Sequence, residues 1–184
     1  DFNQNTSFLT RQVSVDSTNT LEVALGGKPG GVIVIDVIGE DDLPPVIIAN
    51  IDPVANDSGW HNTQVIINYA CDDNASGIEY CPDSVTTDTE GAAQIITATA
   101  RDIAGNEATS TVTLNIDRTL PDISSLVEPL PNNDNWNNTP VTLSYNCQDS
   151  LSGMASCSSP VSLSTEGENQ AVAGQAIDLA GNSA

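Results

Sequence analysis

An internal repeat with a step of 76 residues constrains the fold of this chain more than any other feature. The stretch CDDNASGIEYC, which begins at Cys71, returns as CQDSLSGMASC, which begins at Cys147. The residues that recur at this step are Trp60 and Trp136, Cys71 and Cys147, Asp73 and Asp149, Gly77 and Gly153, Cys81 and Cys157, Glu90 and Glu166, and Asp102 and Asp178. Repetition at the length of a small domain indicates tandem modules.

Short proline-containing segments mark where the modules begin. LPPVI starts at Leu43 and LPDIS at Leu120, so we place a first module at 43–119 and a second module at 120–184. Residues 1–42 form a different unit with three expected strands, the last two joined by GGKPGG, and resemble the C-terminal half of a preceding β-module. The second module ends at DLAGNSA and has no match for STVTLNI, so we expect it to lack its last strand.

Apolar and polar residues alternate with a period of two within the modules, as in QIITATA and STVTLNI, which predicts strands rather than helices. In the first module the expected strands cover 46–51, 64–71, 78–81, 84–88, 94–101 and 108–116. Six or seven short strands in about 75 residues indicate an antiparallel sandwich of immunoglobulin type. The predicted fold class is therefore all-β, with tandem immunoglobulin-like antiparallel β-sandwiches preceded by a partial β-module.

A shared pattern relates both modules to a known family. Each copy has NTxV after its tryptophan, then C.D..SG...C, TEG and A.D.AGN.A, and the first copy adds STVTLNIDRTLP. This pattern resembles the bacterial immunoglobulin-like repeats found in tandem in large secreted and surface proteins, and ATARDIAGNEAT is similar to the hyalin-repeat branch of that fold. The resemblance covers residues 43–184 and implies an extracellular adhesion or spacer module, without catalytic chemistry.

The four cysteines form two closely spaced pairs, and we predict disulfides between Cys71 and Cys81 and between Cys147 and Cys157. Each bond would close a loop of about ten residues and contribute about 2 to 3 kcal/mol. Free buried thiols and a zinc or redox site are the alternatives. Cysteine pairs of this kind are typical of an oxidising compartment, so we expect an extracellular or cell-surface location.

The charge of the chain excludes several classes of partner. Lys and Arg number 4 against 25 Asp and Glu, which gives a formal net charge of -21. Such a charge repels nucleic acids and anionic membrane surfaces, and no apolar run is long enough to cross a bilayer. We expect no nucleic-acid partner and no membrane insertion of this segment, and cations are its natural ligands.

Five aspartates are candidate calcium ligands, namely Asp73, Asp102, Asp117, Asp149 and Asp178. The order of strands in a sandwich brings the loop after the second strand and the turn before the last strand to the end where the chain enters the module. Asp117 lies in the linker that enters the second module, and Asp41 or Asp42 takes its place before the first module. Hard oxygen ligands that converge in this way suit Ca²⁺.

The same aspartates have a second interpretation, which the sequence favours. Asp102 precedes a Gly-Asn turn and Asp73 precedes a Ser-Gly pair, and both patterns recur in the second module. An aspartate in such a turn accepts backbone N–H groups and fixes the turn without a metal. Calcium binding by these aspartates is therefore a hypothesis, and turn capping is the interpretation that the sequence favours.

Other residues offer little for chemistry. His61 is the only histidine and aligns with Asn137, so we interpret it as a surface residue and predict no enzymatic activity. Trp60 and Trp136 each open a strand, and we expect them to pack over the end of a sandwich rather than to stack on a sugar.

The expected function is that of a structural or adhesive segment, a stalk or spacer in a secreted or surface protein. The incomplete ends allow two interpretations. A truncated fragment is favoured, and the other is a filament whose subunits complete one another by strand addition. The alternative function is a module that binds polysaccharide or a host ligand, although aromatic residues make up only 4% of the chain.

Overall fold

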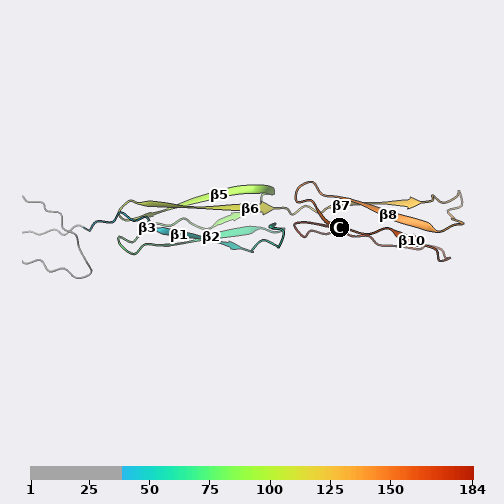
Figure 1. Ribbon diagram of the computed structural model, residues 1–184, viewed down its shortest axis with the longest axis horizontal. Coiled ribbons are helices and arrows are strands. Elements are labelled where there is room, and N and C mark those ends of the chain that lie inside the picture. The colour runs from blue at the N-terminus through green and yellow to red at the C-terminus, as the bar shows by residue number, and fades with distance from the viewer. Residues whose placement is uncertain (1–38) are drawn as a thin grey trace, which may run out of the picture. The chain divides into compact units, whose positions relative to one another are not determined.

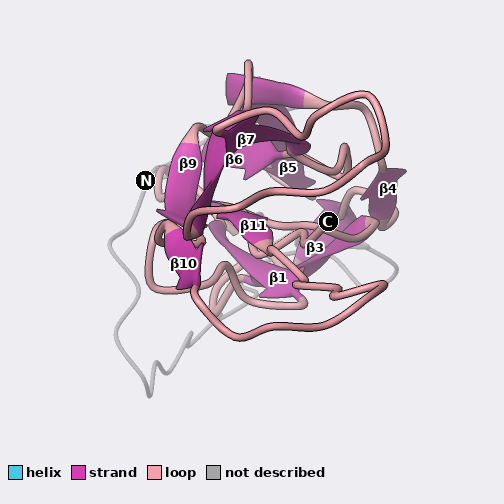
Figure 2. Cartoon of the chain, turned by 90° about the vertical axis from the view of Figure 1, so that its right-hand side faces the viewer, coloured by secondary structure: helices cyan, strands magenta, loops and turns pink. Residues whose placement is uncertain are grey.

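A computed structural model describes residues 39–184. This part of the chain is all-β and contains strands, turns and loops but no helix, as Figure 2 shows by colour. The fold class predicted from the period-two pattern is confirmed at this level. The predictions for residues 1–42 fall almost wholly outside the described residues.

The first module contains six strands, which match the six predicted ones to within three residues at each end. They are β1 (Val46–Asp52), β2 (Val65–Asp72), β3 (Ile78–Tyr80), β4 (Val85–Thr87), β5 (Gly91–Asp102) and β6 (Glu107–Ile116). They form two antiparallel sheets, with the strand orders β1-β2-β4 and β3-β5-β6. In Figure 1, β5 and β6 lie on one side of the first module, and β1 and β2 lie on the other.

The core of the first module lies between these two sheets. Val65 and Ile67 from β2 are fully buried against Leu114 and Ile116 from β6, and residues such as Tyr69 pack around them. Alternate residues of each strand point to the core, which is the burial pattern that the period-two sequence predicts. The first module is therefore a sandwich with an apolar interior.

The second module repeats most of this arrangement. Its strands are β7 (Asp122–Glu128), β8 (Val141–Gln148), β9 (Met154–Cys157), β10 (Val161–Leu163) and β11 (Ala176–Asp178). They form antiparallel sheets with the strand orders β10-β8-β7 and β11-β9. No strand among the described residues corresponds to β6, in agreement with the missing match for STVTLNI. The immunoglobulin-like character of both sandwiches and strand addition from another chain stay predictions.

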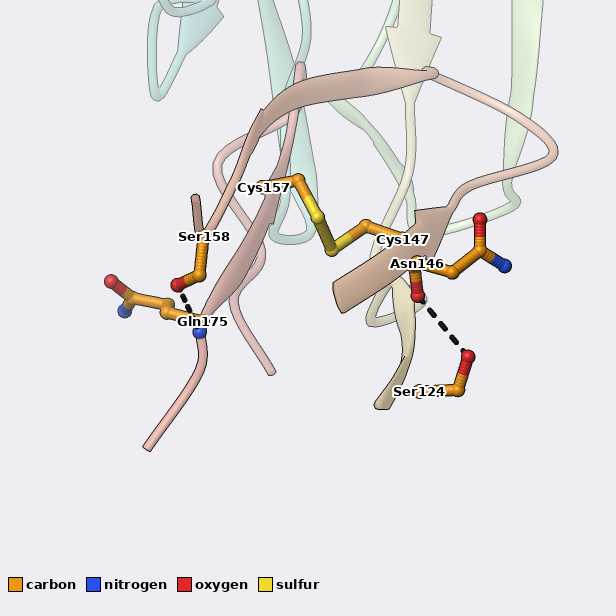
Figure 3. Close-up of a disulfide and its surroundings, with 6 residues drawn as sticks. All are labelled: Ser124, Asn146, Cys147, Cys157, Ser158 and Gln175. Carbon is orange, nitrogen blue, oxygen red and sulfur yellow. Dashed lines mark hydrogen bonds between the residues drawn. A yellow bond between two sulfur atoms is a disulfide. The ribbon is translucent and has the colours of Figure 1, made fainter. Parts of the chain in front are cut away.

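Each module contains one of the two predicted disulfides. Cys71 bonds to Cys81 and Cys147 to Cys157, with Cα atoms 5.8 and 5.9 Å apart, and no described cysteine is free. Cys71 is the last residue but one of β2 in one sheet and Cys81 follows β3 in the other, so the bond ties the two sheets together. Figure 3 shows the second bond, beside which the N–H of Gln175 donates to Oγ of Ser158 over 2.7 Å.

Candidate metal centre

The loop after β2 is a turn closed by the carboxylate of Asp73. Oδ1 of Asp73 accepts the N–H of Ala75 over 3.1 Å and the N–H of Gly77 over 2.7 Å. Gly77 has a φ of 86°, a left-handed backbone conformation that glycine adopts at the least cost. The recurring acid and Ser-Gly pair of the sequence is therefore the signature of an aspartate-capped turn. The other carboxylate oxygen of Asp73, Oδ2, accepts no hydrogen bond within the described residues.

The turn between β5 and β6 is closed in the same manner by Asp102. Oδ1 of Asp102 accepts the N–H groups of Gly105 and Asn106, over 2.7 and 2.8 Å. Oδ2 accepts the side-chain amide of Asn106 over 2.9 Å. The turn thereby holds the carboxylate of Asp102 in a single orientation.

Asp41 reaches both turns from the segment that precedes β1. Its Oδ2 accepts the N–H of Ser76 over 3.1 Å, and its backbone carbonyl accepts the side-chain amide of Asn106 over 3.1 Å. Hydrogen bonds from Ser76 and Leu43 lower the pKa of Asp41 below its usual 3.8. Asp41, Asp73 and Asp102 each offer a carboxylate oxygen, and these three oxygens lie within 4.8 Å of one another. We call this set the first triad.

The second triad consists of Asp117, Asp149 and Asp178, whose oxygens also lie within 4.8 Å of one another. Asp149 accepts the N–H of Gly153 over 2.6 Å, and Asp178 accepts the N–H of Asn182 over 2.8 Å, as their counterparts do in the first module. The two triads are therefore built from the same turns with the same bonds.

Burial is greater in the second triad than in the first, where Asp41 and Asp73 are only half-buried. Asp102 and Asp117 are completely buried, and Asp178 is 1% exposed. The ion pairs Arg101–Glu79 and Arg118–Asp88 include none of the triad residues. Three carboxylates at this range repel one another strongly when a low-dielectric environment surrounds them. A cation bound among them would remove this cost.

Both interpretations of the aspartates fit the geometry. Capping a turn needs one carboxylate per turn, and the backbone bonds account for that role completely. It does not require three carboxylates from separate segments to meet. Calcium takes six to eight oxygen ligands, which carboxylates, carbonyl groups and water supply together. Each triad offers a starting set of three, and hydrogen bonds from Ser76 to Asp41 and from Ser152 to Asp117 also bring the linker aspartates to the turns.

The structure brings together all five aspartates that the sequence singled out, in two groups, one at the entrance of each module, as the sequence predicted. Between the two linker candidates of the first module, Asp41 joins the triad and Asp42 does not. Sequence reasoning missed Asn106 and Asn182, whose side-chain amides bind the linker carbonyl groups of Asp41 and Asp117. Their recurrence in the AGN turn was the available signal.

Two expectations about the exposure of single residues were wrong. His61, expected at the surface, is only 5% exposed, and burial lowers the pKa of its imidazole below the usual 6.5. Its backbone N–H and C=O bind Asn115 and Asp117, which places it under the start of the linker. Trp136 was expected to pack over the sandwich, yet 52% of it is exposed.

Comparison with known proteins identified no relative of this chain. No family description, curated protein or solved structure matches the chain. The relation to bacterial immunoglobulin-like and hyalin repeats therefore stays a prediction from the sequence pattern.

Proposed function

We propose that this chain is a segment of an extracellular spacer, and that calcium ions bound at the two triads fix each module to the linker that precedes it. The observation that supports the proposal most strongly is the composition of the second triad. Asp117 follows β6 of the first module, whereas Asp149 and Asp178 belong to the second module. An ion held by all three residues would fix the linker to the module that it enters.

Hydrogen bonds already hold Asp117 against the second module. The N–H of Ser152 donates to Oδ2 of Asp117 over 3.0 Å, and the side-chain amide of Asn182 donates to its carbonyl oxygen over 2.9 Å. A further bond joins the modules, because the side-chain amide of Asn56 donates to the carbonyl oxygen of Leu179 over 2.9 Å. These contacts position the linker, and the ion would neutralise the charge that gathers there.

The first module holds the other side of the linker. Glu90 accepts the N–H of Arg118 over 2.7 Å and the hydroxyl of Thr119 over 3.0 Å. Arg118 also forms an ion pair with Asp88 over 2.9 Å. A linker bound on both sides is what a stiff spacer requires, because a free linker would let neighbouring modules turn independently.

The two disulfides indicate an oxidising environment and support the extracellular part of the proposal. No helix that is long and apolar enough to cross a bilayer occurs among the described residues. The proposal assigns the chain a mechanical role and no catalysis.

Asp149→Asn distinguishes a metal ligand from a turn cap. Oδ1 of Asp149 accepts the bonds from Leu151, Ser152 and Gly153, and an asparagine oxygen can accept the same bonds. The substitution therefore keeps the turn but removes one negative charge and one ligand oxygen. We expect calcium to raise the melting temperature of the wild-type protein relative to EGTA, with a gain of about 2.7 kcal/mol in unfolding free energy for each bound ion at 100 times Kd. Asp149→Asn should lose the part of this gain that belongs to the second triad.

Two further variants complete the experiment. Asp149→Ala removes the turn bonds as well and should be destabilised in EGTA, whereas Asp149→Asn should be at least as stable as the wild type there because repulsion decreases. Asp83→Asn, at an exposed position outside both triads, should respond to calcium as the wild type does. A wild-type protein that melts at the same temperature in calcium and in EGTA would refute the proposal.

A further inference from the structure

The outer face of the β3-β5-β6 sheet carries a depression that the calcium proposal does not use. It has a volume of about 440 Å³ and is lined by Glu79, Tyr80, Thr99, Arg101 and Glu107. The register of the sheet explains why these residues meet, since Arg101 on β5 is paired with Tyr80 on β3 and with Glu107 on β6. The depression is shallow and open, so a ligand would lie against the sheet rather than be enclosed by it.

The lining residues combine an aromatic ring with polar groups. Tyr80 is 56% exposed, and its neighbour Cys81 is fixed by the disulfide to Cys71. Nε of Arg101 lies 3.2 Å from Oε2 of Glu79, which orients the guanidinium group along the sheet. A guanidinium group donates several hydrogen bonds and carboxylates accept them, so the depression presents both donors and acceptors beside an apolar ring.

The second module shows that folding does not require these residues. The positions of the five lining residues are occupied there by Ala155, Ser156, Gln175, Ile177 and Ser183. The turns beside them are kept, since Gly77 and Asp102 of the first module recur as Gly153 and Asp178. The first module has therefore gained a tyrosine, an arginine and two glutamates on a framework that forms without them.

Charge disfavours anionic ligands in the depression. It contains two carboxylates and one guanidinium group, within a chain whose formal net charge is -21. Acidic sugars, phosphates and nucleic acids would be repelled, and a hydrophobic peptide would cut off Glu107 and the Arg101–Glu79 ion pair from water. A polyol with one apolar ring face matches every group, because hydroxyls both donate and accept hydrogen bonds.

We propose that this depression binds a neutral saccharide, with a sugar ring against Tyr80 and its hydroxyls bonded to Arg101, Glu79 and Glu107. Thr99 adds a hydroxyl, which lies 3.1 Å from that of Thr109. The site is separate from the triads and does not depend on the calcium proposal.

Calorimetric titration of the whole chain with maltohexaose, cellohexaose, mannohexaose and chitohexaose tests the proposal. We expect at least one of them to bind with a Kd below about 5 mM, a weak affinity that suits an open site. Tyr80→Ser and Arg101→Ile introduce the residues of the second module, and each should weaken binding at least tenfold without altering the melting temperature.

Trp136→Ser is the matched control, because Trp136 is an exposed aromatic residue outside the depression. It should bind the saccharide as the wild type does. The proposal is overturned if none of the four oligosaccharides binds, if Tyr80→Ser retains wild-type affinity, or if Trp136→Ser is the variant that loses binding. None of these outcomes bears on the calcium response, which is measured separately by melting.

Discussion

The two modules have the same turns, disulfide and acidic triad but differ in their cores. Val65 and Ile67 are completely buried in the first module, whereas their counterparts Val141 and Leu143 in the second are only half-buried. The difference follows from β6, which supplies Leu114 and Ile116 to the first core and has no counterpart among the described residues of the second.

This contrast shows which features the two modules share although the burial of their apolar residues differs. The turns of Asp149 and Asp178 keep their bonds, and the disulfide keeps its place, although few apolar side chains around them are fully buried. Local covalent and polar bonds therefore define the end of the module at which the linker enters. The apolar core defines the rest.

Substitution of a core residue by alanine should give the largest difference between the modules in the loss of unfolding free energy. Ile67→Ala should reduce the free energy of unfolding by about 3 to 4 kcal/mol, because the side chain is fully buried. Leu143→Ala should cost only about 1 to 2 kcal/mol, since part of the side chain is already exposed to solvent. Hydrogen exchange at β2 and β8 during denaturation measures each module separately. Equal losses would show that the second module has a closed core in solution.

Removal of the disulfides should have the next largest effect. The paired changes Cys71→Ala with Cys81→Ala and Cys147→Ala with Cys157→Ala each open a loop of the same length, at a cost of about 2 to 3 kcal/mol. The first module should remain folded because its core is complete. The second should become sensitive to proteolysis, and its continued resistance would contradict this view.

Substitution of the turn glycines should affect both modules equally. Gly77 and Gly153 have φ values of 86° and 84°, and a Cβ atom at either position meets no atom closer than 3.7 Å. Alanine should therefore cost only backbone strain, about 1 to 2 kcal/mol in each module. Gly39→Ala, where no atom lies within 4 Å, is the control and should be neutral. Unequal costs in thermal melts would mean that the two turns are not equivalent.

The smallest difference between the modules should be in how their stability depends on pH. Only the first module should become less stable as the pH falls, because only it contains His61. Burial lowers the pKa of His61 below its usual 6.5, so the unfolded chain takes up a proton first as the pH falls. Stability is therefore full above pH 6.5 and declines as the pH falls through the lowered pKa. His61→Asn introduces the residue found at Asn137 and should abolish this decline in urea denaturation measured from pH 7.5 to 5.5. A variant with the wild-type pH profile would exclude His61 as the cause.

The alternation and the repeat made the strands, the disulfides and the triads predictable, because each depends on local pattern or on spacing. The burial of His61 depends on a contact with the chain near Asp117, more than fifty positions away. The depression at Tyr80 escaped notice because its residues come from three strands and do not recur in the second module. Sequence reasoning relied on recurrence, so it found the aspartate triads that both modules share and missed the depression that only the first module has.

Isothermal titration of the whole chain with calcium tests the central claim most directly. We expect two ions per wild-type chain, and one ion for Asp149→Asn, which leaves the first triad intact. Asp73→Asn should also retain one ion, because Oδ1 of Asp73 carries its turn bonds and the second triad is unchanged. Absence of binding heat in the wild type, or an unchanged stoichiometry in both variants, would contradict the account.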